Sequence, residues 1–341
     1  MRIADFTRSH IFFSRLASFL AGIFTGWLIM TVIPGARGGM REPPLRSAST
    51  DFALIHPLLT SGATERASRA LAPLEAKFST VVGNAVAHGG IDKVGIYFRD
   101  LESGRWTGVN ESEQFSPASM LKVPTMMAVL NLAEERSPGF LEKRIAYDGS
   151  FDDNRGESIK PTYTLTPGRE YTVEQLVEAM ILHSDNNATR LLHANIDANT
   201  LLDVYHDLGM RLPPERNDID FMSPKSYGLF FRIMYNATYL SRAASDHALK
   251  LLTRADFPQG IRSAVPPDLS VAQKFGERTV LDPDTGKTLF QELHDCGIVY
   301  YPERPYLLCI MTKGSDADQM TRAIQDISRM AYTEVDATYK K

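Results

Sequence analysis

Two residues that could carry out nucleophilic catalysis stand three positions apart at the head of an apolar stretch. Ser119 and Lys122 lie within Ser116–Leu130, and no further charge follows Lys122 until Glu134. On a helix, residues three apart are neighbours, with about 5–6 Å between their Cβ atoms. A serine hydroxyl becomes an effective nucleophile when an adjacent base accepts its proton, and a lysine can do so when burial lowers its pKa.

The same pair also has an ordinary explanation, because a serine three residues before a lysine is usually a helix cap followed by a solvated charge. The apolar run Val123–Leu130 favours the catalytic interpretation, since such a run is expected to be buried. A surface lysine is not normally found at its head. The first turn of this helix would also present free backbone N–H groups, which suit an oxyanion.

The composition excludes several classes of function. The chain has 341 residues, 43% of them hydrophobic and 23% charged, and a formal net charge of −4. These values are ordinary for a globular protein, and no basic run or basic-aromatic patch indicates a nucleic-acid partner. Two cysteines are too few for a disulfide framework or a thiolate-rich metal site, and no HExxH motif occurs. We therefore expect no metal and no cofactor.

An uncharged apolar segment lies close to the N-terminus. Leu16–Ile33 contains 18 residues without a charge, preceded by Arg2, Arg8 and Arg15. This length just suffices for a membrane-spanning helix, and the basic flank predicts a cytoplasmic N-terminus. A cleaved signal peptide is the alternative, although the run is long and Pro34 is poorly placed for cleavage. We expect residues 1–33 to anchor an extracytoplasmic catalytic domain to the membrane, or to release it if they are cleaved.

The rest of the chain divides into a linker and one domain. Residues 34–66, rich in Gly, Pro and Ser, predict a tether, and residues 67–335 predict the catalytic domain. Hydrophobic periodicity predicts a helix, two strands, a block of helices, three strands and a last helix. The predicted elements are 67–88, 93–100, 105–110, 117–135, 172–182, 188–194, 199–208, 224–254, 271–276, 293–301, 306–312 and 316–333, with mostly loop over 136–171.

This order predicts an α+β fold, in which an antiparallel sheet is flanked by terminal helices and carries an all-helical subdomain. The sheet subdomain would comprise 67–112 and 255–335, and the helical subdomain 113–254. Cys296 and Cys309 fall on adjacent predicted strands. Because the strand register is not fixed by the sequence, we expect them to be buried free thiols.

Three short motifs follow one another along this domain: Ser119-x-x-Lys122, Ser184-Asp185-Asn186 and Lys274-Phe275-Gly276. The first two patterns each occur once, whereas K-x-G also occurs at Lys93-Val94-Gly95, so the third carries weight only through its place on a predicted strand. Together they resemble the serine β-lactamase and penicillin-binding protein superfamily, and most closely the class A β-lactamases. The resemblance covers about residues 66–335 and implies the β-lactamase/transpeptidase-like fold.

The resemblance implies a role for each residue of the first two motifs. Ser119 would attack an amide or β-lactam carbonyl to form an acyl-enzyme, and Lys122 would take or relay its proton. Ser184 would pass a proton to the departing nitrogen. Asn186 would hold Lys122 and the amide group of the substrate.

In the third motif, Lys274 would keep the pocket positive and attract the substrate carboxylate. Gly276 and Phe275 would contact the substrate, and the backbone N–H groups of Ser119 and Glu277 would form the oxyanion hole. Phe275 stands where the family usually has a hydroxyl residue, so one expected hydrogen bond to a β-lactam carboxylate is lost.

The class A enzymes also carry a glutamate, in an E-P-x-x-N context after S-D-N, that drives deacylation through water. The corresponding stretch, 208–221, is short and lacks that motif, and Glu215 is its only glutamate. Glu215 is therefore either the base or an exposed loop charge. Without a base, the acyl-enzyme would hydrolyse slowly.

We therefore expect an exported, class A β-lactamase-like serine hydrolase that opens β-lactams and so takes part in their catabolism and in the response to antibiotics. Two alternatives remain open. One is a penicillin-binding D,D-peptidase-like protein that acts on a peptidoglycan stem peptide. The other is a non-catalytic peptidoglycan-binding module.

Overall fold

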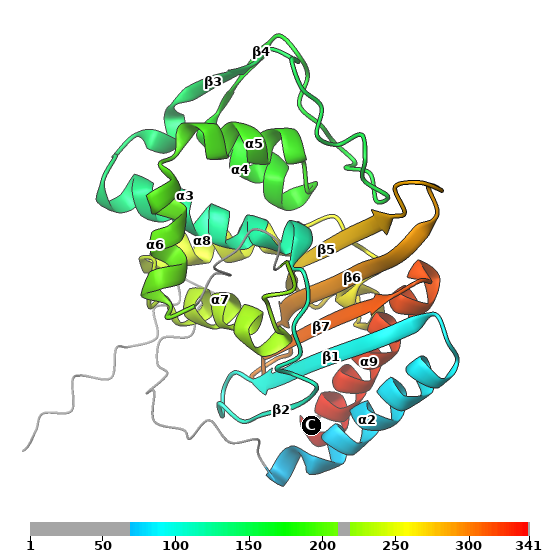
Figure 1. Cartoon of the computed structure of the whole chain (residues 1–341). Helices are drawn as coiled ribbons and strands as arrows, with labels where there is room; N and C mark the ends of the chain where they lie inside the picture. The colour runs from blue at the N-terminus through cyan, green and yellow to red at the C-terminus, as the bar shows by residue number, and fades with distance from the viewer. Residues whose placement is uncertain (1–68, 211–218, 340–341) are drawn as a thin grey trace, which may run out of the picture. The chain divides into compact units, whose positions relative to one another are not determined.

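A five-stranded antiparallel sheet lies at the centre of the computed structural model, which describes residues 69–210 and 219–339 (Figure 1). The strand order is β2-β1-β7-β6-β5. The strands span Ile91–Asp100 (β1), Trp106–Val109 (β2), Val271–Leu281 (β5), Thr288–Val299 (β6) and Tyr306–Gly314 (β7). Because β1 pairs with β7, the two ends of the domain are joined within one sheet.

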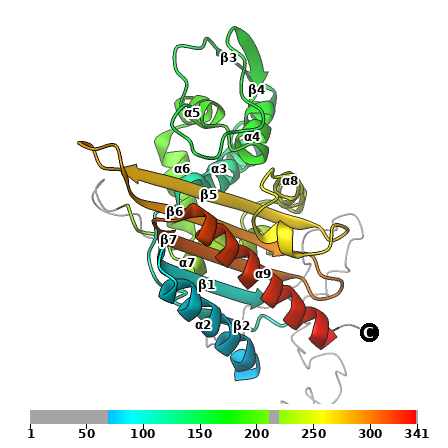
Figure 2. The same ribbon diagram turned by 90° about the vertical axis from the view of Figure 1, so that its right-hand side faces the viewer.

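Two helices from opposite ends of the domain cover one face of this sheet (Figure 2). They are α2 (Ala72–Ala87), preceded by a 3₁₀ turn η1 (Arg69–Leu71), and α9 (Ala317–Tyr339). The buried residues of α2, Leu74, Phe78 and Val82, recur every fourth position, which places them on one side of the helix. Burying a side chain of this size contributes about 1.5–3 kcal/mol.

The remaining helices lie on the other side of the sheet, and only the last two of them contact its strands extensively. They are α3 (Lys122–Glu135), α4 (Val173–Leu182), α5 (Asn186–Asn195), α6 (Ala198–Asp207), α7 (Pro224–Asn236) and α8 (Arg242–Thr253). Helix α3 contacts α4, α6 and α8. Nine successive residues of α3, Lys122–Leu130, are buried, so the first part of this helix is enclosed on every side. The lysine at its head is therefore inside the protein.

The predicted fold class is confirmed, with differences in three places. Ala237 adopts a left-handed conformation (φ 49°) and Ser241 caps α8, so the predicted helix 224–254 is two helices. The region 136–171, expected to be mostly loop, contains the 3₁₀ turn η3 (Phe140–Glu142) and the hairpin of β3 (Arg144–Tyr147) with β4 (Arg169–Thr172). Strands β5 and β6 are also longer than predicted.

The helix that leads to the S-D-N motif, predicted over 172–182, begins with a capping box. Thr172 Oγ1 accepts a hydrogen bond from the Gln175 backbone N–H (3.2 Å), and Gln175 Oε1 accepts one from the Thr172 N–H (2.9 Å). This capping box satisfies two backbone donors at the start of α4.

The predicted membrane anchor (1–33) and linker (34–66) lie outside the described residues. Among the helices that are described, none is both long and apolar enough to span a bilayer.

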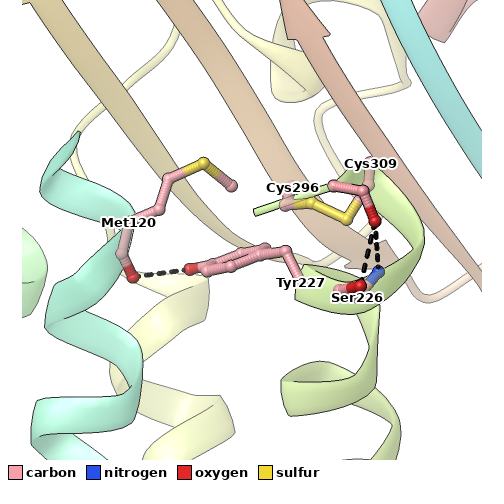
Figure 3. Close-up of a disulfide and its surroundings, with 6 residues drawn as sticks. Met120, Ser226, Tyr227, Cys296 and Cys309 are labelled. Carbon is pink, nitrogen blue, oxygen red and sulfur yellow. Dashed lines mark hydrogen bonds between the residues drawn. A yellow bond between two sulfur atoms is a disulfide. The ribbon is translucent and has the colours of Figure 1, made fainter. Parts of the chain in front are cut away.

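The two cysteines form a disulfide between β6 and β7, so the prediction of free thiols is wrong (Figure 3). Cys296 and Cys309 are direct partners in the strand register, and their Cα atoms are 4.1 Å apart. The sequence placed them on neighbouring strands but could not fix this register. The pair is fully buried in the core that the sheet shares with the helical layer.

Removing this cross-link is expected to lower the stability of the domain. The cysteines are 13 positions apart, and closing a loop of this size stabilises by roughly 3 kcal/mol, mainly through the unfolded chain. Denaturant unfolding with and without a thiol reductant should show a difference of about 2–3 kcal/mol.

The double variant Cys296→Ala/Cys309→Ala serves as the control, because the reductant should not change its unfolding midpoint. Titration of two free thiols in the oxidised, unfolded protein would contradict the disulfide.

Candidate active site

The nucleophile turn, defined here as residues 116–121, is fixed at its first residue. Both the backbone N–H and the carbonyl of Ser116 contact side chains of strand β6. Glu292 Oε1 accepts a hydrogen bond from the Ser116 N–H (3.2 Å), and His294 Nε2 lies 2.9 Å from the Ser116 carbonyl oxygen. His294 Nδ1 accepts from the Thr312 N–H (3.2 Å), so the neutral tautomer with a proton on Nε2 fits both contacts. Burial lowers the pKa of His294 to about 4, which keeps it in this neutral form.

The turn then passes through a strained residue into helix α3. Ala118 has φ 49°, a conformation that costs a non-glycine residue about 1–3 kcal/mol. The 3₁₀ turn η2 (Ala118–Leu121) follows and leads directly into α3. From the opposite side, the Tyr227 hydroxyl donates to the Met120 carbonyl (2.8 Å), next to the disulfide (Figure 3). These contacts fix the backbone on both sides of Ser119.

Strand β5 approaches this turn closely at Gly276. A Cβ atom added there would lie 2.7 Å from the Pro117 carbonyl oxygen and 2.7 Å from Met120 Cγ. Only glycine permits this approach without a shift of the turn. Gly276 therefore brings the third motif against the nucleophile turn.

Lys122 is the centre of the polar contacts. Its Nζ lies 2.9 Å from Ser119 Oγ, 2.8 Å from the Ser184 carbonyl oxygen, 3.0 Å from Ser184 Oγ and 2.6 Å from Asn186 Oδ1. The side chain is only 3% exposed. Burial lowers the pKa of Lys122 to about 8, while the charges of Glu157 and Asp185 act in the opposite direction.

A neutral amine can make these contacts and still accept a proton. A neutral Lys122 has two hydrogens and one lone pair, and the Ser184 carbonyl and Asn186 Oδ1 can only accept. If the two hydrogens go to these acceptors, the lone pair remains for the Ser119 hydroxyl. Lys122 is then placed to take the proton of Ser119 as it attacks.

Ser184 connects the two lysines. Its Oγ lies 3.0 Å from Lys122 Nζ and 3.1 Å from Lys274 Nζ. A hydroxyl has two lone pairs and one hydrogen, so Ser184 can face both amines and still donate its proton elsewhere. Ser184 adopts φ 59° between α4 and α5, and Asp185 Oδ1 caps α5 by accepting from the Ala188 N–H (2.7 Å).

Lys274 is fully buried, and its Nζ also donates to the Phe275 carbonyl (3.0 Å). Burial and the nearby Lys122 charge hold the pKa of Lys274 well below its usual value, and Asp295 opposes this shift. Asp295 is itself fully buried, and desolvation raises its pKa to about 7.

The side chain of Phe275 does not lie where the sequence places it. We expect a substrate contact from the motif, but Phe275 is 5% exposed and stacks on Phe257 with ring centroids 4.2 Å apart. It belongs to the core between the sheet and α9, because its direct partner on β6 is Asp295, on the same face. Its ring centroid is 4.1 Å from Lys274 Nζ, so it covers that amine instead.

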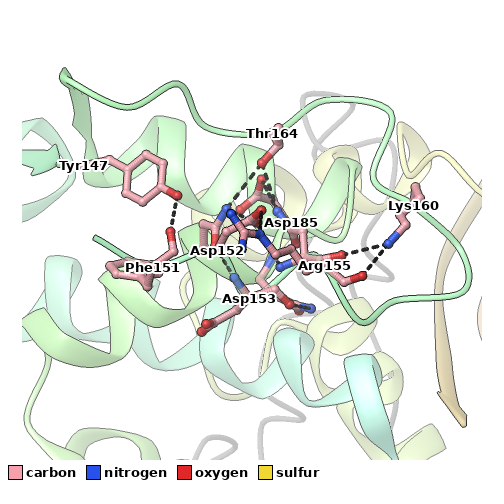
Figure 4. A network of polar contacts seen from close by, with 11 residues as sticks. Tyr147, Phe151, Asp152, Asp153, Arg155, Lys160, Thr164 and Asp185 are labelled. Atoms are coloured by element: carbon pink, nitrogen blue, oxygen red, sulfur yellow. Dashed lines mark hydrogen bonds and ion pairs between the residues drawn. The ribbon is translucent and has the colours of Figure 1, made fainter. Parts of the chain in front are cut away.

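A long loop, 148–168, packs against the S-D-N motif (Figure 4). The sequence predicts a loop here but does not indicate this contact. Asp185 Oδ2 accepts from Asn154 Nδ2 and from the Leu165 N–H, both at 3.2 Å. Asn154 Oδ1 in turn accepts from the Asn186 N–H (2.8 Å). The buried Asp185 thus fixes both the motif and the loop beside it.

Two carboxylates connect this loop to the motifs. Glu157 Oε1 accepts a hydrogen bond from Asn186 Nδ2 (2.6 Å). Glu277 Oε1 accepts from the Ser158 N–H (2.6 Å) and the Ile159 N–H (2.9 Å), and burial raises the pKa of Glu277. Glu277 lines the same cavity as Ser119. This position is compatible with the predicted role of its backbone N–H in the oxyanion hole, which stays a prediction.

The cavity at Ser119 has a volume of about 480 Å³. One wall is formed by Thr125, Thr189, His193 and Ile219, with Thr125 Oγ1 3.1 Å from His193 Nε2. Its lining also includes Ser116, Ala118, Ser119, Leu121, Lys122, Glu157, Asn186, Glu277 and Arg278. Glu215 lies outside the described residues. Over 69–210 and 219–339, no group of three or more His, Cys, Asp or Glu side chains is arranged to hold a metal ion.

A family model described as the β-lactamase enzyme family matches residues 73–335. The chain belongs to the β-lactamase enzyme family. A β-lactamase from Streptomyces fradiae is 25% identical to it over 231 residues, which are 62% of this chain and 71% of that protein.

Two solved structures show the same fold. A β-lactamase from Sphaerobacter thermophilus matches 77% of this chain and 97% of its own, with 23% identity and a TM-score of 0.63. A mutant of PBP-A, solved as an acyl-enzyme complex with penicillin G, matches 81% of this chain and 100% of its own, with 22% identity and a TM-score of 0.62.

The pKa of Lys122 predicts how acylation of this β-lactamase-family chain depends on pH. Its neutral form accepts the Ser119 proton, so the second-order rate of labelling by a fluorescent penicillin should rise about tenfold per pH unit from pH 6 and level off near pH 8. Lys122→Arg keeps a cation that does not deprotonate, and should react at least about 100-fold more slowly. A rate that is constant between pH 6 and 9 would exclude Lys122 as the base.

The close approach at Gly276 predicts a second effect. Gly276→Ala should push β5 from the nucleophile turn and reduce labelling by about 10²–10³-fold, the usual cost of losing one oxyanion donor. Gly83→Ala in α2 is the matched control, because nothing lies within 4 Å of its added Cβ. Equal labelling rates for both variants would contradict this account of the third motif.

Proposed function

We propose that the chain is an exported serine hydrolase that opens β-lactams by acylation of Ser119. The observation that carries this proposal is the position of the buried Lys122 amine, within hydrogen-bond distance of Ser119, Ser184 and Asn186 at once. A hydroxyl, a base and a second proton carrier within hydrogen-bond distance of the same amine are what acyl transfer requires. Membership of the β-lactamase enzyme family supports the choice of a β-lactam as acyl donor.

The reaction follows from this arrangement. Ser119 Oγ attacks the lactam carbonyl as Lys122 takes its proton, and the backbone N–H groups of Ser119 and Glu277 receive the oxyanion. The C–N bond breaks as Ser184 donates its proton to the leaving nitrogen. Lys122 and Lys274 both lie beside Ser184 Oγ, so either amine can return a proton to it.

We also propose export, with residues 1–33 as anchor or signal. The disulfide between Cys296 and Cys309 supports this, because disulfides persist mainly in oxidising compartments outside the cytosol. The uncharged segment Leu16–Ile33 with its basic flank points the same way.

Covalent labelling tests the proposed chemistry. The full-length chain incubated with a fluorescent penicillin should carry one adduct, which Ser119→Ala should abolish. Ser112→Ala, an exposed serine on the same approach to the turn, should label like the unchanged chain. If the unchanged chain forms no adduct, the enzymatic proposal fails and a non-catalytic peptidoglycan-binding module becomes the better explanation.

A penicillin-binding, D,D-peptidase-like protein acting on stem peptides is the second candidate. In the described part of the chain, the carboxylates that line the cavity are Glu157 and Glu277, and each already accepts hydrogen bonds. Slow deacylation would follow if neither can activate water. The lifetime of the Ser119 adduct separates the two: release within seconds indicates a β-lactamase, and persistence for many minutes indicates a peptidase-like protein.

A further inference from the structure

The amide group of Asn186 is already saturated. Its Nδ2 has two hydrogens, and it donates to the Asp153 carbonyl (3.2 Å) and to Glu157 Oε1 (2.6 Å). Its Oδ1 accepts from Lys122. A substrate that needs a hydrogen bond from Asn186 must therefore displace one of these acceptors. The Asp153 carbonyl belongs to the backbone of a loop that Asp185 fixes through Asn154, so the Glu157 side chain is the acceptor that can move.

Glu157 is also placed to act on the charge of what enters. It lines the cavity together with Ser119 and Asn186. Across the described residues, Glu157 is in no ion pair, and its carboxylate accepts one hydrogen bond, from the neutral Asn186 amide. Its charge acts on Lys122 through space, but among the described residues it has no direct ion-pair partner at the point where the Asn186 amide faces the cavity.

We infer that Glu157 selects acyl donors that carry a positive charge beside the amide carbonyl bound by Asn186. This inference rests on the proposed acylation of Ser119. As the substrate carbonyl takes the N–H of Asn186, the displaced carboxylate lies next to the carbon bonded to that carbonyl. An ammonium on this carbon gives Glu157 a new partner, whereas a carboxylate there is repelled at close range.

Three penicillins that differ only at this carbon provide the test. Benzylpenicillin carries hydrogen, ampicillin an ammonium and carbenicillin a carboxylate. Their second-order acylation rates can be measured on the full-length chain by competition with a fluorescent penicillin, which works whether deacylation is fast or slow. The unchanged chain should react fastest with ampicillin and slowest with carbenicillin.

Glu157→Gln keeps the size and the hydrogen-bonding capacity of the side chain but removes its charge. It should lower the ampicillin-to-carbenicillin rate ratio at least about tenfold, with a smaller change for benzylpenicillin. The ratio in the unchanged chain should also fall as salt is raised, because the contact faces solvent. Glu170→Gln on β4 makes the same chemical change at an exposed site outside the cavity and should keep the original ratio.

A ratio that is the same in the unchanged chain and in Glu157→Gln would overturn this inference while leaving the proposed function intact. A parallel drop with Glu170→Gln would also overturn it, because the effect would then reflect net charge and not position. Absence of any Ser119-dependent adduct would overturn the proposed function and this inference together.

Discussion

The active site depends on keeping two lysine amines buried beside one hydroxyl. Lys122 Nζ and Lys274 Nζ lie 3.0 and 3.1 Å from Ser184 Oγ, so they are no more than about 6 Å apart. Two full positive charges at that distance would repel by about 3 kcal/mol in a protein interior of ordinary polarity. Burial adds to this cost, so the arrangement is favourable only if one amine is neutral. The fold thus turns a lysine, which is ordinarily protonated, into a group that can accept a proton.

The rest of the domain holds this arrangement together from three directions. Lys122 is the first residue of helix α3 in the helical layer, and Ser184 and Asn186 lie at the junction of α4 and α5. The edge strand β5 brings Lys274 across, and its approach is possible because Gly276 has no side chain. Each of these elements is held in place by its own contacts within the domain. The geometry of the site is therefore formed before a substrate binds.

Much of this could be predicted from the sequence, and the exceptions have physical reasons. The Ser119–Lys122 contact follows from helical spacing, and the capping box at Thr172 follows from local chemistry. Glu157 and Asn154 could not be found, since loop 148–168 has no periodicity and gains its order from the buried Asp185. The disulfide and the face of the sheet on which Phe275 lies both depend on the strand register. A one-residue slip in the register would move each side chain to the opposite face.

Loop 148–168 carries the residue proposed to select the substrate and contacts the residue predicted to bind the oxyanion. Glu277 uses its side chain to hold the Ser158 and Ile159 N–H groups of this loop, and its own backbone N–H is the predicted oxyanion donor. Glu157 is adjacent to Ser158, so the residue proposed to meet the incoming acyl group is connected, through the hydrogen bond of the Ser158 N–H, to the strand predicted to bind the oxyanion. A substrate that displaces the Glu157 side chain does so directly beside the backbone N–H groups that Glu277 holds. In this domain the fit of the acyl side chain and the rate of acylation should change together.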